Sequence, residues 1–532
     1  MTNDRPLMKM IACSNIVFLT IFALISGCAA GPDFTRPDAP KGADYAPQAL
    51  PEESHSAPVH GGEPQRFSKG SDIPFDWWKS FNSPQLDSLV QRAIQFNPTI
   101  EAAQAALRQA NEMVYAQQGL FFPTLSASYG FERQQLAGNS GGNSPGIQGN
   151  GSIISTTSGT PASQGGSAPY NAPVTYNFHT AQLNVGYVPD VFGLNRREVE
   201  SLKAQAEYER FQYEAAYMTL ASNVVAAAIQ EASVRSQIEA TKQIIDLNAH
   251  SLKILRDQFK SGYAMRIDVA AQESALAQAE QLLAPLEKQY EQTRDLIRAL
   301  SGRLPNEDIE ETFEFSSLQL PQSLPLSLPS KIIEQRPDVR SAEEQLHAAN
   351  AQVGVAIANW LPQISITGAY GGEASVFEQM FQPGGPFWNL IGSVSQTLFD
   401  GNSLLHRKRA AEQALHQAAA QYRSTVIAAY QNIADTLHAL LSDADSLAAA
   451  VKAEEAAKVT LDLTRRQQEA GYVNSLILLS AQLSYQQALV TRVQAQTNRF
   501  NDTVALFEAL GGGWWNREET KIEKAAQNSR DR

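Results

Sequence analysis

An internal repeat constrains this 532-residue chain more than any other feature of its sequence. Pro98 through Ser128 aligns without gaps onto Pro337 through Thr367. The matching pairs include Ala103/Ala342, Leu107/Leu346, Asn111/Asn350, Val114/Val353 and Pro123/Pro362, and further along Gly262/Gly471 and Tyr263/Tyr472. Because self-similarity of this kind marks a repeated structural unit, the chain is predicted to contain two copies of one unit.

Within each copy, the residues after Pro123 or Pro362 alternate between apolar and polar, as in a strand with two different faces. The clearest apolar positions are Leu125, Ala127, Tyr129 and Phe131, then Ala181, Leu183, Val185 and Tyr187, and in the second copy Ile364, Ile366 and Tyr370. The alternation is weaker from Trp388 to Phe399. Tilted membrane strands have roughly this length, about 9–11 residues. Several aromatic residues fit the interfacial girdles of a barrel: Tyr129, Phe131, Phe178, Tyr187, Tyr370, Phe387 and Trp388. The alternative is a half-buried sheet of a water-soluble protein.

The strands are followed by unusually long helical patterns. Apolar residues recur every seven positions at Tyr217, Val224, Ile238, Ile245, Leu252 and Phe259, with Leu220, Ala227, Val234 and Leu255 on the partner register. The second copy repeats the pattern at Val426, Ile433, Leu440, Leu447 and Leu461. Sustained heptads predict coiled-coil packing. A helix from Asn195 to Lys260 is on the order of 100 Å long, which suits a protein that crosses a cellular compartment.

Two copies give four strands per chain, and four strands are too few to close a membrane barrel. Lipid offers no water to the backbone groups of an open sheet edge, so only closed barrels are stable there. Closed membrane barrels begin at about eight strands. The chain is therefore predicted to share its barrel with identical copies, and three chains in a symmetric ring would supply about twelve strands.

The N-terminus is typical of a bacterial lipoprotein signal. Arg5 and Lys9 provide a basic start, and residues 16–25 provide an apolar core that is short for a membrane span. Ile25-Ser26-Gly27-Cys28 has the aliphatic, small, small, Cys order of a lipoprotein box, in which the thiol receives a diacylglyceryl group. Ala29 follows rather than Asp, which permits sorting to the outer membrane. The alternative is a buried cysteine at the end of an apolar run. The sequence thus predicts a lipid anchor at Cys28.

Charge and motif content argue against several function classes. The formal net charge of −13 disfavours nucleic-acid binding, which needs a basic face. The eight histidines show no HExxH spacing, and His406 and His416 fit a solvated helical surface better than a metal site. There is no glycine-rich phosphate loop. Cys13 would leave with the signal, so no cysteine remains for a disulfide or a cysteine metal site. No enzymatic activity, cofactor or metal is predicted.

Several segments together resemble the TolC-like outer membrane factor family, in particular its lipoprotein branch of drug-efflux channels (NodT/OprM-like). These segments are 28–34 (CAAGPDF), 77–81 (WWKSF), 334–343 (EQRPDVRSAE), 348–354 (AANAQVG) and 509–514 (ALGGGW). The resemblance runs from about Cys28 to Trp514 and rests on the order and spacing of these segments. Arg336-Pro337-Asp338, which opens the second copy, is interpreted as a structural helix start.

The resemblance implies an α+β membrane protein. It implies a homotrimer whose twelve-stranded outer-membrane β-barrel, four strands per chain, continues into a long periplasmic α-helical barrel. The implied partners are a periplasmic membrane-fusion adaptor, an inner-membrane transporter of the RND type and outer-membrane lipids. The chain would be the passive exit duct of a tripartite efflux system for drugs or other toxic small molecules. Two alternatives stay open: the duct of a type I protein secretion system, and a non-conducting coiled-coil structural lipoprotein.

In that family the two long hairpins turn at a periplasmic tip, where the adaptor docks and the entrance closes. The matching turns here lie around Gly262-Tyr263 and Gly471-Tyr472. The alternative for these glycines is helix punctuation alone. Many members carry an acidic residue just after the second tip glycine, but this chain has Val473-Asn474-Ser475. Arg465, Arg466 and Asn474 are therefore the candidate residues for holding the entrance shut.

The predicted layout assigns every part of the chain. It comprises a signal peptide (1–27), a lipid anchor with an extended strap (28–75), a first repeat (76–302) with a flexible Gly/Ser-rich loop (137–175), a linker (303–330), a second repeat (331–513) and a polar tail (514–532).

Overall fold

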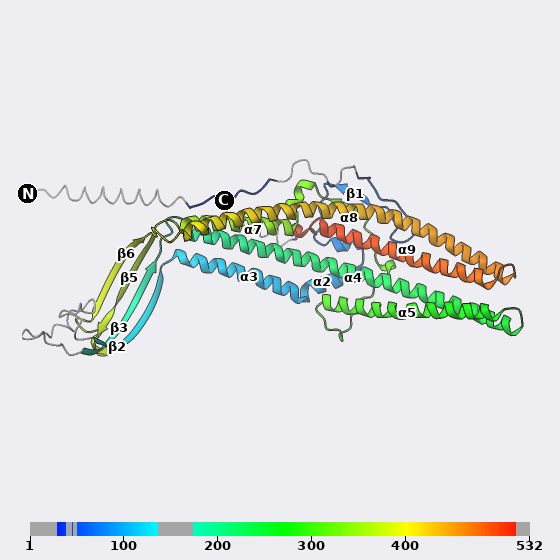
Figure 1. Ribbon diagram of the computed structural model, residues 1–532, viewed down its shortest axis with the longest axis horizontal. Coiled ribbons are helices and arrows are strands. Elements are labelled where there is room, and N and C mark those ends of the chain that lie inside the picture. The colour runs from blue at the N-terminus through cyan, green and yellow to red at the C-terminus, as the bar shows by residue number, and fades with distance from the viewer. Residues whose placement is uncertain (1–28, 39–44, 46–49, 137–173, 518–532) are drawn as a thin grey trace, which may run out of the picture. The chain divides into compact units, whose positions relative to one another are not determined.

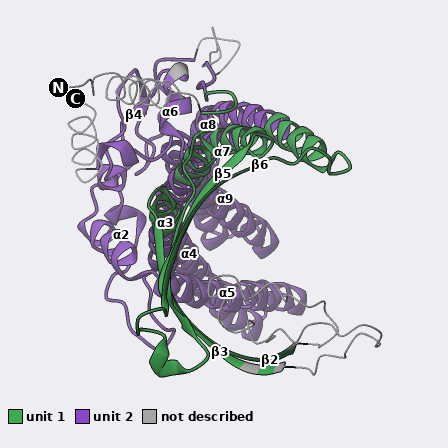
Figure 2. Ribbon diagram, turned by 90° about the vertical axis from the view of Figure 1, so that its left-hand side faces the viewer, with its two compact units in different colours: residues 1–34, 111–203, 347–416 green, residues 35–110, 204–346, 417–532 purple. Residues whose placement is uncertain are grey.

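A computed structural model describes residues 29–38, 45, 50–136 and 174–517 (Figure 1). The predicted signal peptide, Cys28, nearly all of the Gly/Ser-rich loop and the end of the polar tail lie outside these residues. The chain divides into two compact units (Figure 2). Unit 1 comprises residues 1–34, 111–203 and 347–416, and unit 2 comprises residues 35–110, 204–346 and 417–532. Four helices have one part in each unit: α3 (Pro98–Gln118), α4 (Leu194–Lys260), α7 (Pro337–Ala358) and α8 (Ser403–Glu469).

The order of elements confirms the predicted repeat. The series α3, β2, β3, α4, α5 returns as α7, β5, β6, α8, α9. Helices α4 and α8 both have 67 residues, and α5 (Arg266–Leu300) and α9 (Ser475–Ala509) both have 35. Equal helix lengths in the two copies mean that the extra residues of the first copy fall between its strands. The other α-helices of the described residues are α2 (Pro84–Phe96) and the short α6 (Ile332–Gln335).

Unit 1 is built around one antiparallel sheet of four strands in the order β2-β3-β5-β6, which form a single curved layer (Figure 2). The strands are β2 (Thr124–Leu136), β3 (Val174–Tyr187), β5 (Gln363–Ala374) and β6 (Pro386–Ser395). Strand β3 therefore takes in the last two residues of the predicted loop. Pro123 and Pro362 stand directly before β2 and β5, where a residue without a backbone N–H cannot continue a helix.

Unit 2 holds most of α4 and α8 and all of α5 and α9, which form two helical hairpins, α4–α5 and α8–α9 (Figure 1). The heptad prediction is confirmed because its apolar positions are buried here. Val224, Val234, Ile433, Leu440 and Leu447 are each at most 1% exposed. Among the other predicted positions, Ile238 and Ile245 are half-buried, and Phe259, which lies near the end of its hairpin, is 43% exposed.

No helix within the described ranges combines the length and the apolar content that crossing a bilayer would require.

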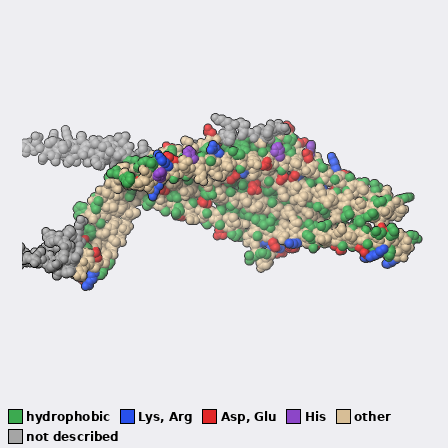
Figure 3. All heavy atoms as spheres, viewed as in Figure 1, with side chains coloured by type: hydrophobic (Ala, Val, Ile, Leu, Met, Phe, Trp, Pro, Cys, Tyr) green, Lys and Arg blue, Asp and Glu red, His purple; other side chains and the backbone are tan. Residues whose placement is uncertain are grey.

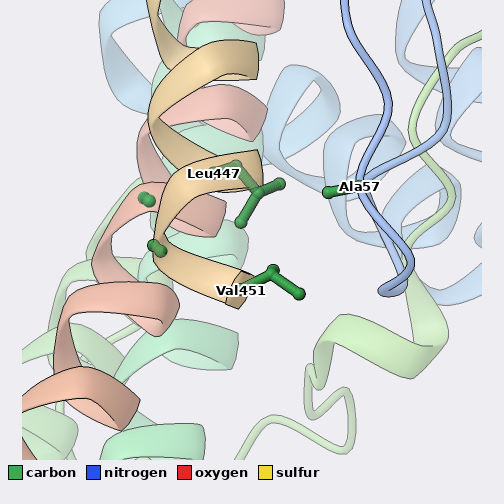
Figure 4. Close-up of a cluster of buried hydrophobic side chains, with 5 residues drawn as sticks. Ala57, Leu447 and Val451 are labelled. Carbon is green, nitrogen blue, oxygen red and sulfur yellow. The ribbon is translucent and has the colours of Figure 1, made fainter. Parts of the chain in front are cut away.

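Residues 50–75, which lead into the first repeat, pack along the helices of unit 2. Strand β1 (Arg66–Lys69) pairs in parallel with β4 (Ser323–Leu326). Ala57 packs on Leu447 and Val451 of α8, in a cluster that also includes Ala450 and Ala495 (Figure 4). This segment is therefore extended along much of its length, yet it is fixed to the helices by a small apolar contact.

A buried arginine reinforces that attachment. The Arg499 side chain on α9 is fully buried. Its guanidinium donates hydrogen bonds to three oxygens of the segment: Ser54 Oγ (3.1 Å), His55 O (3.4 Å) and Glu63 O (2.6 Å). Because a buried cation is costly without partners, these carbonyl and hydroxyl oxygens make the segment part of the fold of unit 2.

The motif at Arg336 joins the two ends of the second repeat. Arg336 forms a two-pronged pair with Asp338 (3.0 and 2.8 Å) and donates to the carbonyl of Ala509 at 2.7 Å. Trp514 Nε1 donates to Gln335 O at 2.7 Å. Three glycines, Gly511, Gly512 and Gly513, lie between Ala509 and Trp514, and all three have positive φ. A Cβ on Gly511 would lie 2.7 Å from Gln335 O. These glycines let the end of α9 fold back on the start of α7.

Candidate functional site

The register of the sheet collects the apolar residues of all four strands on one face. Cross-strand partners lie on the same face of a sheet, and Tyr129 is opposite Ala181, Leu183 opposite Tyr370, and Tyr370 opposite Trp388. This apolar face consists mainly of Leu125, Ala127, Tyr129 and Phe131 on β2, Ala181, Leu183, Val185 and Tyr187 on β3, Ile364, Ile366 and Tyr370 on β5, and Trp388, Leu390 and Val394 on β6. Many of these side chains are exposed, with Trp388 at 74% and Leu390 at 70%.

The opposite face of the sheet is mainly polar, with Ile391 as an exposed apolar exception. It carries Thr124, Ser126 and Ser128, Thr180, Gln182 and Asn184, Gln363, Ser365 and Thr367, and Asn389, Ser393 and Ser395. Hydrogen bonds join neighbouring strands across it, from Asn184 Nδ2 to Ser128 Oγ (3.1 Å) and between the hydroxyls of Ser365 and Ser393 (2.7 Å). Phe178 and Phe387 also lie on this face, so the prediction that they belong to an outer aromatic girdle is wrong.

The outer edges of the sheet have no neighbouring strand among the described residues. Strands β3 and β5 are each paired on both sides, whereas β2 and β6 are each paired on one side only. Such an edge presents a row of backbone N–H and C=O groups that can pair with another strand. One face is apolar, one is polar and two edges are open, which is the arrangement needed to extend the sheet around a ring.

A histidine lies at the centre of an aromatic cluster on the apolar face. His179 Nδ1 is 2.9 Å from the Tyr129 hydroxyl, and its ring lies 4.8 Å from the ring of Phe131 and 6.1 Å from that of Phe377. His179 continues the alternation of Ala181 and Leu183, so its place on the apolar face could be found from the sequence. A polar tip in an apolar setting suits a membrane–water interface.

A cavity of 470 Å³ opens where the polar face of the sheet meets the first turns of α4. Its apolar wall includes Leu120, Phe122 and Phe192, and its polar wall includes Glu198, Ser365 and Thr367. The nearby Asp190 carboxylate is already engaged, since it accepts from the backbone N–H groups of Asn195 and Arg196 at the start of α4.

The two hairpin tips have nearly identical turns. At the first tip, the Gly262 N–H donates to Phe259 O (3.0 Å) and the Tyr263 N–H donates to Gln258 O (2.8 Å). At the second tip, Gly471 and Tyr472 make the same bonds to Gln468 O (3.0 Å) and Gln467 O (2.8 Å). The φ angles of Gly262 and Gly471 are +80° and +79°. Each tip therefore ends its helix with a Schellman motif, which explains why glycine stands at both positions.

The tips present apolar side chains to the surroundings. Tyr263 is 87% and Tyr472 is 83% exposed, and the other large exposed side chains there are Met265, Ile267, Leu476 and Ile477. Arg256 and Arg266 form ion pairs with Glu273 beside the first tip (2.9 and 3.5 Å). Hydrophobic side chains and Lys or Arg side chains are mixed at this end of the hairpins (Figure 3). Exposed aromatic and aliphatic residues with charges around them are typical of a protein-binding surface.

The three candidate entrance residues lie close to the second tip in different roles. Arg465 and Arg466 line a cavity of 230 Å³ between the two hairpins, together with Leu255 and Leu478. Arg465 also pairs with Asp462 at 3.5 Å. The Asn474 side chain caps α9 by accepting a hydrogen bond from the Ile477 N–H at 3.1 Å. The arginines are thus placed where two hairpins approach, whereas Asn474 stabilises the helix start.

Among the residues that the structure describes, no three His, Cys, Asp or Glu side chains gather closely enough to hold a metal ion. The predicted acylation site, Cys28, lies outside the described residues, and its neighbour Ala29 is the first residue within them.

Comparison with known proteins gives one family and a consistent set of relatives. The profile of the outer membrane efflux protein family matches residues 89–303 and 328–512. The chain is 29% identical over 452 residues to the pyoverdine export outer membrane protein OpmQ of Pseudomonas aeruginosa, covering 84% of this chain and 89% of OpmQ. It is 26% identical to the outer membrane protein OprJ of the same organism, covering 93% of this chain and 95% of OprJ.

Solved structures resemble the fold over nearly the whole chain. The outer-membrane channel OprN matches with a TM-score of 0.76 at 24% identity, over 92% of this chain and 100% of OprN. The Campylobacter jejuni outer membrane channel CmeC matches with a TM-score of 0.78 at 21% identity, over 94% of this chain and 98% of CmeC. At these identities the likeness shows the fold alone, and it confirms the predicted combination of a strand sheet with long helices.

Proposed function

Because the chain belongs to the outer membrane efflux protein family, we propose that it is the outer-membrane channel of a tripartite efflux system and the passive exit duct for toxic small molecules. The long helices would extend into the periplasm, where a membrane-fusion adaptor and an inner-membrane transporter of the RND type would complete the pathway. The chain itself would carry out no enzymatic chemistry, and the transporter would supply the energy.

The observation that carries this proposal is the two-faced sheet with open edges. An apolar face suits lipid and a polar face suits a water-filled interior, as in other outer-membrane barrels. The edges of β2 and β6 need partners because unpaired backbone groups are costly in a membrane. Three copies joined edge to edge, β6 of one to β2 of the next, would supply those partners and close a barrel of about twelve strands.

The tips support the proposed partnership with an adaptor. Gly262 and Gly471 hold Tyr263 and Tyr472 in matching positions, and both tyrosines are more than four-fifths exposed. Aromatic side chains on a rigid turn can anchor a partner with little loss of conformational entropy. We infer that the same end of the hairpins forms the closed entrance, with Arg465 and Arg466 contributing polar contacts across it.

A wide passive duct selects its cargo weakly, so the inner-membrane transporter would decide what is exported. The relatives are named for different cargoes, among them pyoverdine for OpmQ and solvents for the efflux pump protein SrpC of Pseudomonas putida. We propose small toxic molecules as the cargo class, with the acyl chains of Cys28 anchoring the duct in the outer membrane.

Single-channel recording in a planar lipid bilayer tests the proposal. Purified wild-type protein should insert and give discrete conductance steps, because a barrel with a polar interior carries ions. A control variant with Leu390→Arg places a charge on the apolar face at mid-strand and should insert far less often, since a charge costs about 2–4 kcal/mol near the bilayer centre. Wild-type protein that binds vesicles without any conductance would contradict the proposal and favour a non-conducting structural lipoprotein.

The protein secretion alternative requires a separate experiment. A strain lacking this chain should become more sensitive to drugs, dyes or detergents and should export its proteins normally. Loss of an exported protein with unchanged sensitivity would favour the duct of a type I secretion system.

A further inference from the structure

The first described residues lie in a groove of unit 1 formed by α4, α7 and the turn before α4. Their contacts are, in chain order, the Ala30 N–H donating to Phe192 O (2.9 Å), Pro32 O accepting from Asn350 Nδ2 (2.9 Å), and the Phe34 ring stacked on the His347 ring (4.3 Å between centroids). Residues 29–34 are thus held along their whole length, starting one residue after the predicted acylation site.

One arginine makes most of the polar contacts. The side chain of Arg197 on α4 is 5% exposed. It donates Nε–H to Ala30 O (3.0 Å) and Nη2–H to Gly31 O (3.3 Å), and its Nη2 pairs with Asp33 Oδ1 (2.7 Å). Its fourth partner, Glu200, lies on α4 at 2.7 Å. If residues 29–34 left the groove, Arg197 would lose three of its four partners, and water would take their place.

The groove also selects the segment by shape. Gly31 has a φ of +92°, and a Cβ on it would lie 2.4 Å from the Cα of Gly354 on α7. A Cβ on Gly354 would lie 2.8 Å from Ala30 O and 2.9 Å from Arg197 Cδ. Two glycines in direct contact therefore allow the segment to lie against α7, and a side chain at either position would push it out.

Helices α4 and α7 also contact each other without the segment between them. Those helices are joined directly, because Gln352 Nε2 donates to Ser201 Oγ at 2.9 Å and Ser201 Oγ donates to Ala348 O at 3.4 Å. The Asp33 side chain, which forms an ion pair with Arg197, is 92% exposed. The groove therefore resembles a binding site for a peptide more than a part of the unit's core.

We propose that this groove is a binding site for the chain's own acylated N-terminal segment. Docking of the segment would fix the position of the lipid anchor relative to unit 1 and its sheet. Acyl chains on a free tether would keep the protein at the membrane but leave the sheet unoriented. A docked segment instead fixes where the anchor leaves unit 1, which raises the effective concentration of the sheet at the bilayer. This inference rests on the proposed outer-membrane function and on acylation of Cys28.

The test compares two forms of the full mature chain, one acylated and one exported with a signal that leaves Ala29 as the first residue, without an acyl group. Each form carries Arg197→Ala, Gly354→Ala or the matched control Lys203→Ala, an exposed residue of α4. Gly354→Ala is the cleaner variant, because alanine favours the α7 helix while its Cβ blocks the segment. Hydrogen exchange of the Ala30 N–H, which donates to Phe192 O in the docked segment, measures docking, and trimer recovered from outer membranes measures assembly.

We expect Arg197→Ala and Gly354→Ala to abolish exchange protection of the Ala30 N–H in both forms. In the acylated form, trimer yield should fall by about tenfold, the scale of losing hydrogen bonds to a charged group. In the form without an acyl group, the same variants should leave the already lower yield unchanged, and Lys203→Ala should have no effect in either form. Equal losses in both forms, or undocking with full assembly, would overturn the inference. Conductance of the wild-type trimers is recorded in parallel, so failure of the proposed channel function would be seen separately.

Discussion

At the scale of single residues, a pair of carboxylates in unit 2 makes stability depend on pH. Asp443 on α8 interacts with Asp502 on α9. Burial, and then the neighbouring Asp443, raise the pKa of Asp502 to about 7. Burial also raises the pKa of Asp443, although the charge of Arg499 acts in the opposite direction. An acid whose pKa is raised by folding adds stability at low pH, and that stability is lost as the pH rises through the folded pKa.

Asp502→Asn should therefore change stability at high pH only. At about pH 3, below the ordinary pKa of an aspartate, the pair is protonated in both the folded and the unfolded chain, and the neutral amide should give a similar unfolding midpoint. At pH 8 both wild-type carboxylates are charged, and the variant should unfold at a temperature higher by about 3 °C. Thermal unfolding followed by circular dichroism measures this, with the exposed Asp435→Asn on α8 as the control. The same pH dependence in variant and wild type would show that the pair does not titrate in this range.

Sequence reasoning found some single residues and missed others for a physical reason. Gly262 and Gly471 were found because a helix that stops at a left-handed glycine leaves a local signal. Arg197 was missed because its partners, Ala30 and Gly31, are far away in the chain and only the fold brings them together. Glutamates and arginines on a helix are usually solvated, so nothing local distinguishes a buried arginine from its exposed neighbours.

At the scale of elements, periodicity predicted the helices well and the faces of the strands less well. The heptad positions Ile433, Leu440 and Leu447 are buried because a seven-residue spacing keeps a side chain on one helix face. The alternation of β2 and β5 also gave the correct faces. Phe178 and Phe387 were misassigned because aromatic type was used instead of register, and a shift of one residue moves a side chain to the opposite face.

The hairpin tips carry the arginines that we expect to hold the entrance closed. Arg465 and Arg466 line the cavity between the two hairpins, and we expect the double variant Arg465→Gln/Arg466→Gln to loosen the closed entrance. Leak conductance through the resting channel should rise by about tenfold, which corresponds to losing roughly one charge-assisted hydrogen bond. The control is Arg423→Gln, an exposed position of α8 far along the helix from the tip. If leak current and drug sensitivity both stay at the wild-type level, these arginines do not hold the entrance.

At the scale of the whole molecule, a sheet of four strands with two open edges predicts a ring of several copies. The sequence indicated four strands, and the structure adds their order, which leaves β2 and β6 at the edges. No local pattern could identify the edges, because strand order depends on which strands the fold places side by side. The antiparallel order also means that β6 of one copy and β2 of the next would run in opposite directions, so a ring of copies keeps one continuous antiparallel sheet.

Disulfide cross-linking of the edges tests that ring. Cysteines at Ser126 or Ser128 on β2 are combined with cysteines at Asn389 or Ser393 on β6, all on the polar face. One pairing should bring two Cα atoms within about 4.4–6.8 Å across the junction and form a disulfide. The control is Asn184→Cys with Ala369→Cys, which are register partners on the inner strands and should link only within one chain. Denaturing gels should show covalent dimers and trimers and nothing larger, because a closed ring offers no free edge to a further copy. A ladder that continues past the trimer would mean an open assembly, and a β2–β6 link confined to single chains would mean that four strands close on themselves.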